Sequence, residues 1–135
     1  MRIITGSARG CRLKTPKGAE VTRPTADRVK ESLFNILGAM VPGRKVLDIF
    51  AGTGNLGLEA LSRGAEHAVF VDKATAKLIA ENLELTRLAE KAVVRSGDVF
   101  AELARQASAA AEFSLIFCDP PYHKGLWQQA LQQGR

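Results

Sequence analysis

Residues 45–57 read Lys-Val-Leu-Asp-Ile-Phe-Ala-Gly-Thr-Gly-Asn-Leu-Gly, an apolar run that passes directly into a glycine loop. Lys45 to Phe50 predicts a buried strand, because β-favouring residues follow one another almost without a break. Leu56 to Arg63 predicts a helix that ends at Gly64. A strand, a glycine loop and a helix in this order are typical of α/β sheets that bind nucleotides and related cofactors.

The same alternation continues along the chain. Strands are predicted at 67–71, 92–95 and 114–118, and helices at 75–88 and 99–111. Strands that alternate with helices of this length imply right-handed crossovers and a parallel sheet. The sequence therefore predicts an α/β fold, a Rossmann-like parallel sheet with helices on both faces. The buried side chains expected in the helix 75–88 include Leu78, Ile79, Leu83 and Leu85.

An N-terminal extension precedes this core. Residues 2–5 and 11–14 flank a turn-rich segment and predict a β-hairpin. Thr25 is a suitable cap for a helix from Ala26 to Leu37. We expect one domain over 1–135, made of the extension 1–43 and a cofactor-binding and catalytic core 44–135. The face that the helix is expected to bury is formed by Val29, Leu33, Ile36 and Leu37.

The composition fits a single domain with an ordinary core, because 46% of the 135 residues are hydrophobic. No apolar run approaches the roughly 18–20 residues of a membrane span, and the first residues lead into no signal peptide. Cys11 and Cys118 lie far apart and form no CxxC pair. We therefore expect no membrane segment, no disulfide and no bound metal, and a cytoplasmic setting is favoured.

Positive charge is concentrated near the N-terminus. Residues 1–45 carry ten Lys or Arg against three acids, whereas the rest of the chain carries nine against eleven. A basic extension on a nearly neutral body predicts that a polyanion docks there. An ordinary solvated surface has the same composition, so charge alone leaves both interpretations open.

Residues 52–57 match the pattern GxGxxG, and Asp72 follows about 20 residues later. This is the formal fingerprint of a dinucleotide site, so a nicotinamide or flavin enzyme has to be weighed. Asp48 argues against it, because a pyrophosphate beside a carboxylate in a partly desolvated crevice is strongly repelled. S-adenosylmethionine has no phosphate, and its sulfonium and ammonium groups would be attracted by Asp48.

Acidic residues recur at the ends of successive predicted strands. Asp72 follows the second strand, where it can accept from ribose hydroxyls, and Asp98 follows the third, where it can accept from an adenine amino group. Each of them alone is as easily a helix cap or a loop acid. Together with Asp48, and with Asp119 after the fourth strand, they predict a site for a cationic methyl donor.

Residues 118–123 read Cys-Asp-Pro-Pro-Tyr-His and end the fourth predicted strand. Neither helix nor strand continues through two prolines, which lack N–H groups and have a fixed φ. Asp119 and the carbonyls of this turn are acceptors for a planar NH2 group, and Tyr122 offers a ring on which a flat base can stack. The turn by itself is equally well explained as a loop that ends a strand.

These motifs resemble a known family. Residues 48–54 look like motif I of class I S-adenosylmethionine-dependent methyltransferases, and 119–122 look like motif IV of those that methylate exocyclic amines. Residues 22–35, with 2–4 and 57–64, resemble the bacterial 16S ribosomal RNA guanine-N2 methyltransferase family. Members of that family continue through further strands, so we expect these C-terminal strands to be missing. The fourth strand would then be an exposed edge, through which the chain could dimerise.

The resemblance implies methyl transfer from S-adenosyl-L-methionine to the exocyclic N2 amine of a guanine in 16S ribosomal RNA or the small ribosomal subunit. It gives catalytic roles to Asp119, Pro120, Pro121 and Tyr122. Lys73 is a candidate cover for the adenine face or simply a solvated lysine. The residues to which the resemblance assigns cofactor binding are Asp48, Phe50, Ala51, Gly52, Thr53, Gly54, Asp72, Lys73, Asp98 and Val99.

The candidate phosphate contacts are basic side chains of the extension, namely Arg2, Arg9, Arg12, Lys14, Arg23 and Arg28. Arg23 and Lys30 are also suited to ordering the loop over the cofactor. Three alternatives stay open: a dehydrogenase, a remnant that binds cofactor or RNA without catalysis, and a methyltransferase that acts on DNA or on protein glutamine.

Overall fold

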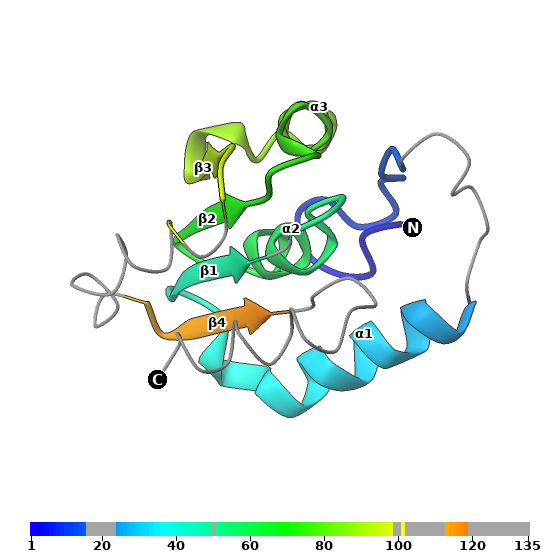
Figure 1. The fold of residues 1–135 in the computed structure, drawn as a ribbon. Helices are drawn as coiled ribbons and strands as arrows, with labels where there is room; N and C mark the ends of the chain where they lie inside the picture. The colour runs from blue at the N-terminus through cyan, green and yellow to red at the C-terminus, as the bar shows by residue number, and fades with distance from the viewer. Residues whose placement is uncertain (16–23, 50, 99–100, 102–112, 119–135) are drawn as a thin grey trace.

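Four parallel strands form the sheet in the computed structural model, which describes residues 1–15, 24–49, 51–98, 101 and 113–118 (Figure 1). The spatial order is β3-β2-β1-β4, and each neighbouring pair is parallel. The predicted parallel sheet is therefore confirmed. The strands are β1 (Lys45–Ile49), β2 (His67–Val71), β3 (Ala92–Arg95) and β4 (Leu115–Cys118).

The helices lie close to their predicted positions, with ends that differ by one or two residues. They are α1 (Pro24–Leu37), α2 (Asn55–Ser62) and α3 (Ala76–Thr86), with short 3-10 turns η1 (Gly38–Met40) and η2 (Ala89–Lys91). The helix predicted for 99–111 falls outside the described residues, apart from residue 101.

The main core lies on one face of the sheet. Phe70 of β2, Leu58 of α2 and Ile79 of α3 belong to one buried cluster, together with Phe34 of α1 and Ile3 of the N-terminal segment. A smaller cluster on the opposite face is made of Leu47, Ile49, Val69 and Val71. The three described helices therefore cover one face. The predicted cover of the second face depends on the stretch 99–111 and stays a prediction.

The predicted inner face of α1 was partly wrong. Leu33 and Leu37 pack against the core as expected, but Val29 is 63% exposed and Ile36 82% exposed. Phe34 and Lys30, one helical turn apart, take the inward positions instead. Phe34 packs on the ring of Phe117 in β4, and Lys30 finds ionic partners inside the protein.

A similar error concerns α3. Ile79 and Leu83 are buried as predicted, whereas Leu85 is 48% exposed. The polar side chains of Asn82 and Thr86 are buried beside them. A prediction from hydrophobicity alone misses such positions. These polar side chains can be buried because they have hydrogen-bond partners in the folded chain.

The N-terminal segment 1–14 forms a single antiparallel bridge between Arg2 and Arg12 in place of the two strands of the predicted hairpin. The N–H of Ile3 donates to the carbonyl of Cys11 at 2.9 Å. The segment is fastened to α2 through Ser62, whose Oγ accepts from the N–H of Ala8 at 2.9 Å. No described helix is long and apolar enough to cross a membrane.

Gly57 is packed too closely to accept a larger residue. A Cβ there would lie 2.4 Å from the ring of Phe70 and 3.1 Å from Oδ2 of Asp48. We expect Gly57→Ala to lower the free energy of unfolding by about 2 kcal/mol, because this overlap outweighs the ~1 kcal/mol that alanine gains over glycine in a helix.

Urea unfolding at neutral pH measures this loss. The control is Gly97→Ala, since a Cβ at Gly97 meets nothing within 4 Å, and its stability should stay within about 0.5 kcal/mol of the wild type. Equal stability of the two variants would contradict the close packing of Gly57.

Candidate functional site

The candidate site lies at the rim where the parallel strands end. Ile49 of β1 is in register with Val71 of β2 on one side and with Cys118 of β4 on the other. Val71 is in turn in register with Arg95 of β3. The four carboxyl ends therefore lie side by side (Figure 1), and ligands of open α/β sheets bind at this edge.

Asp48 holds the beginning of α2. Its carboxylate is 2% exposed, and Oδ2 accepts from the N–H of Gly57 at 2.9 Å. The sequence predicted that this side chain faces the ligand crevice, and this stays a prediction; in the structure one of its oxygens accepts from the helix backbone. A carboxylate near a helix N-terminus is favoured by the helix dipole, so Asp48 helps to fix the loop between β1 and α2.

Asp72 links the glycine loop to the next βα connection. Its Oδ2 accepts from the N–H of Gly52 at 3.0 Å, and its Oδ1 accepts from the N–H groups of Ala74 at 2.9 Å and Thr75 at 3.2 Å. The side chain sits at the rim, as predicted. A carboxylate has about four acceptor positions, so these bonds leave capacity for a ligand hydroxyl.

The glycine loop offers open space on one side only. Gly52 and Gly54 have φ of 58° and 83°, a left-handed backbone that favours glycine. A Cβ on Gly52 would meet nothing within 4 Å, whereas one on Gly54 would meet Leu58 at 3.2 Å. Gly52 therefore leaves a cradle at the rim, and Gly54 packs toward the core.

The remaining described cofactor candidates surround this cradle or flank it. Lys73 and Asp98 are exposed, and Oδ1 of Asp98 accepts from the N–H of Ala101 at 3.2 Å. Ala51 and Thr53 are buried in the loop. Asp48, Asp72 and Asp98 against Lys73 and Arg95 leave the rim with one more negative than positive charge, which fits a cationic ligand better than a phosphate. The predicted cofactor residues Phe50 and Val99, and the predicted catalytic residues 119–122, lie outside the described residues.

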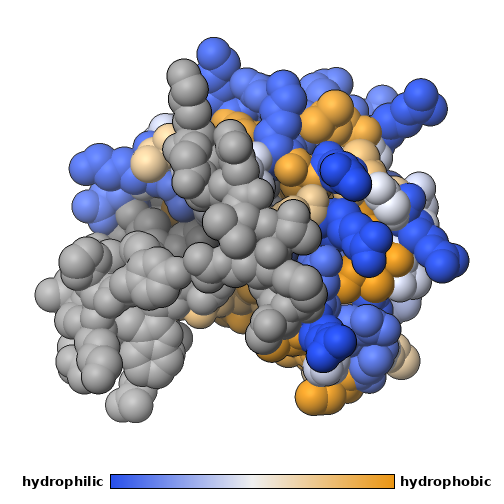
Figure 2. Space-filling view, turned by 90° about the vertical axis from the view of Figure 1, so that its right-hand side faces the viewer, coloured by the Kyte–Doolittle hydropathy of each residue, from blue (hydrophilic) through white to orange (hydrophobic). Residues whose placement is uncertain are grey.

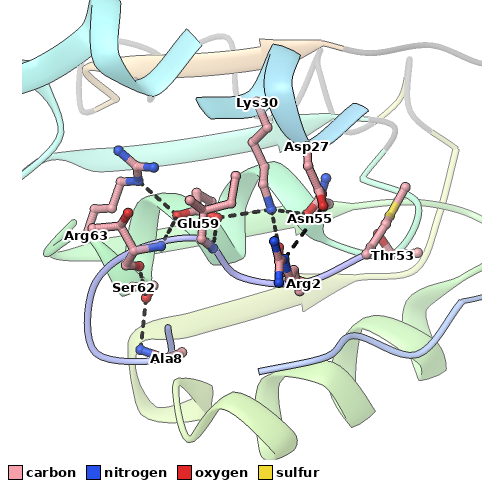
Figure 3. Close-up of polar contacts among 12 residues, drawn as sticks. Arg2, Ala8, Asp27, Lys30, Thr53, Asn55, Glu59, Ser62 and Arg63 are labelled. Atoms are coloured by element: carbon pink, nitrogen blue, oxygen red, sulfur yellow. Dashed lines mark hydrogen bonds and ion pairs between the residues drawn. The ribbon is translucent and has the colours of Figure 1, made fainter. Parts of the chain in front are cut away.

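A buried ion-pair cluster that was not predicted from the sequence lies behind the loop (Figure 3). The carboxylate of Glu59 on α2 lies 3.0 Å from Lys30 Nζ and 2.9 Å from Arg63 Nε. It also accepts from the N–H groups of Ile4 and Thr5. The available signal was an acid inside the apolar run 57–61, a position where a charge is costly unless it is paired.

Burial and pairing shift the pKa values of this cluster. Burial alone would raise the pKa of Glu59, but the Ile4 N–H, the Arg63 guanidinium and the charge of Lys30 outweigh it and hold the pKa below its ordinary value. Burial lowers the pKa of Lys30, although the charge of Glu59 opposes this shift.

Lys30 also contacts the glycine loop. Its Nζ donates to Oδ1 of Asn55, the first residue of α2, at 2.7 Å, and to the carbonyl of Arg2 at 2.6 Å (Figure 3). Lys30 therefore contacts the residue at which the glycine loop passes into α2, and its role in ordering the loop over the cofactor stays a prediction.

The predicted phosphate contacts in the described extension are all exposed residues. Arg2 approaches Asp27 at 3.7 Å and Lys14 pairs with Glu81 at 3.1 Å, and both basic side chains remain more than half exposed. Hydrophilic residues form much of the coloured surface in Figure 2, which faces the side toward which the strands point. Arg9, Arg12 and Arg28 are exposed as well, and Arg23 falls outside the described residues.

Within the described ranges, no group of three or more His, Cys, Asp or Glu side chains is placed to hold a metal ion. Cys11 carries a free thiol.

Comparison with known proteins identifies the family. The family model described as "Conserved hypothetical protein 95" matches residues 1–134. The chain belongs to this family. It is 48% identical to the "Putative rRNA methyltransferase YlbH" of Bacillus subtilis over 90% of this chain and 67% of the relative. It is 38% identical to the "Ribosomal RNA small subunit methyltransferase D" of Haemophilus influenzae over 97% of this chain and 68% of the relative.

A solved structure agrees with these relatives. The "Putative methyltransferase yhhF" of Escherichia coli superposes with a TM-score of 0.81 at 38% identity, over 98% of this chain and 71% of that one. The predicted family and the class I methyltransferase fold are thereby confirmed. The chain spans about two thirds of the length of the curated relatives it matches.

The buried cluster generates a prediction about stability. Glu59→Gln leaves the cations of Lys30 and Arg63 without their buried partner. We therefore expect the free energy of unfolding at pH 7 to fall by about 3–5 kcal/mol. Glu81→Gln is the control, since it breaks only the exposed pair with Lys14 and should cost at most about 1 kcal/mol.

The difference in the free energy of unfolding between wild type and Glu59→Gln should become smaller in acid. Because the pKa of Glu59 is lower in the folded state than its ordinary value of 4.5, the unfolded chain takes up this proton first. The contribution of Glu59 is therefore complete above pH 4.5 and is lost as the pH falls through the folded-state value. Urea unfolding across this range measures the difference, and a constant difference would contradict the ionised, paired state of Glu59.

Proposed function

We propose that this chain transfers a methyl group from S-adenosylmethionine to ribosomal RNA, and that the acceptor is the exocyclic N2 amine of a guanine in 16S RNA. The observation that carries the proposal is the acidic glycine cradle at the rim. It lies beside the strand end from which the chain runs into Asp-Pro-Pro-Tyr. The names of the relatives support an RNA substrate in the small subunit.

The rim supplies what a cationic donor needs. The donor brings an electrophilic methyl on sulfur, and the protein binds and orients it. Gly52 gives the donor close access to the backbone, and Asp72, which already accepts three hydrogen bonds, keeps about one acceptor position for a ribose hydroxyl. Asp98 is assigned to the adenine amine. Asp48 contributes its negative charge behind the loop, since its hydrogen bond is to the start of α2.

The acceptor side is assigned to the turn that follows β4. Cys118, the last residue of β4, is in register with Ile49 of β1, so the turn leaves the sheet next to the donor loop. We assign Asp119 and the Pro120 carbonyl to accept the hydrogens of the amine, and Pro121 to keep the turn rigid. The methyl–sulfur bond would break as the methyl–nitrogen bond forms, and these acceptors would stabilise the positive charge that develops on nitrogen. The nitrogen would then release one hydrogen as a proton to solvent. Tyr122 is assigned to stack on the extruded base.

The basic extension is proposed to dock the RNA. Exposed cations of the extension lie on the N-terminal segment, and Lys30 of α1 links this segment to the glycine loop by donating to the carbonyl of Arg2 and to Asn55. Phosphate contacts on this segment would therefore bring the RNA to the rim. A cytoplasmic setting, and a dimer through the edge of β4, belong to the same proposal.

The deciding experiment measures transfer of tritiated methyl to small ribosomal subunits and maps the product by mass spectrometry. We expect one labelled guanine carrying the methyl on N2. Asp119→Asn should lower kcat about 100-fold or more, because the acceptor for the amine hydrogens weakens, while S-adenosylhomocysteine still binds. Label in DNA or protein but not in RNA would refute the RNA substrate. Binding of NAD instead of S-adenosylhomocysteine would refute the donor.

Docking by the extension predicts a steep salt dependence. Replacing Arg9 and Arg12 by alanine should weaken RNA binding at low salt and reduce the slope of log K against log salt by about 2, one for each phosphate contact. Lys91→Ala, an exposed lysine of η2 outside the extension, is the control and should leave the slope unchanged. Filter binding between 50 and 200 mM salt, roughly the range in which such contacts respond, measures both. Equal slopes in all three proteins would refute the docking surface.

A further inference from the structure

A buried asparagine joins the N-terminal segment to the glycine loop. Asn82 of α3 is 0% exposed. Its Nδ2 donates to the carbonyl of Thr53 at 2.9 Å and to the carbonyl of Lys14 at 3.0 Å, and its Oδ1 accepts from the N–H of Lys14 at 2.7 Å. These three bonds go to backbone atoms, so they fix where the two segments lie whatever their side chains are.

The partner in the loop is an unusual one. Thr53 lies between two glycines of positive φ, in a stretch that belongs to neither β1 nor α2. Its carbonyl therefore lies outside the strand ladder of β1, and the amide of Asn82 donates to it. A buried carbonyl that loses its donor is costly, so the conformation of the loop depends on Asn82.

Two further contacts connect the same two segments. The hydroxyl of Thr53 lies 3.4 Å from the sulfur of Met1, and Lys30 bridges Asn55 to the carbonyl of Arg2 (Figure 3). The glycine loop is thus tied to the N-terminal segment on each side of Gly54. Donor loop and RNA-docking segment form one hydrogen-bonded unit.

We propose that Asn82 is a positioning residue for methyl transfer. It sets the loop that receives the donor against the segment that carries the RNA-contacting cations, and so fixes the separation between methyl carbon and target nitrogen. Methyl transfer is sensitive to this separation, because a misplacement of about 1 Å can cost about 100-fold in rate. The catalytic consequence rests on the proposed function, whereas the dependence of the loop on Asn82 does not.

The test compares Asn82→Leu and Asn82→Asp with a matched control. Both variants remove the donor to Thr53, and the aspartate keeps an acceptor for the Lys14 N–H. Thr86→Val is the control, because it removes another buried polar group of α3 while all three bonds of the Asn82 side chain remain. It reports what a general loss of stability does to the protein.

The first readout is hydrogen exchange of the ligand-free protein. We expect amides in 51–57 and 1–14 to exchange about tenfold faster in both Asn82 variants, and to keep wild-type rates in Thr86→Val. The second readout is methyl transfer to small ribosomal subunits: kcat should fall about 100-fold in the Asn82 variants, because the separation between methyl carbon and nitrogen changes. The Kd of S-adenosylhomocysteine and the KM for the donor should rise about tenfold, whereas the Kd for RNA changes less.

The outcomes separate the two proposals. If loop exchange in the Asn82 variants equals that of Thr86→Val, Asn82 is only a core residue and the inference is overturned. If the exchange changes but kcat, donor affinity and KM do not, its positioning role is likewise overturned. Failure of the wild type to bind S-adenosylhomocysteine would overturn the proposed function, and hydrogen exchange would still judge the role of Asn82.

Discussion

The structure depends on one buried carboxylate. Glu59 belongs to α2, yet its oxygens contact α1 through Lys30 and the N-terminal segment through the N–H groups of Ile4 and Thr5. Three parts of the chain that are remote in sequence therefore share a single charge. A buried ion pair gives little net stability, because desolvation offsets its attraction, but it tolerates almost no change of geometry. In this protein the ion pair therefore fixes one position of the extension relative to α2.

That placement matters because the rim is assembled from short pieces. No single element of the described chain contains the candidate site; β1, β2 and β3 each end beside it. Asp72 connects the first two βα connections with one carboxylate, and Asp48 secures the start of α2. Two of the acids predicted to bind the ligand thus also hold the backbone around it. A rim that is held before the ligand arrives has less to order on binding.

The sequence was sufficient for the sheet and for the position of the rim, because both follow from local signals. The apolar run 45–49, the glycine loop and the strand-ending acids all act within a few residues. It was insufficient for the inward side of α1 and α3, where Lys30 and Asn82 are buried and Val29 and Leu85 are exposed. Those outcomes depend on partners 25 to 68 residues away, such as Asn55 for Lys30 and Lys14 for Asn82. Such long-range polar pairing gives no periodic pattern in the sequence. The single acid Glu59 in an apolar run was the one indication of it in the sequence.

The attachment of residues 1–14 has a consequence for biosynthesis. These residues leave the ribosome first, but their hydrogen-bond partners on α2 and α3 follow 54 to 74 positions later. Loops of that length close slowly, so the basic arm should be among the last parts of a nascent chain to become ordered. In an incomplete chain the basic side chains of residues 1–14 would be present, but the contacts that hold this segment next to the rim would not yet have formed. If this segment docks RNA as proposed, the contact would become selective only once the protein has been synthesised past α3.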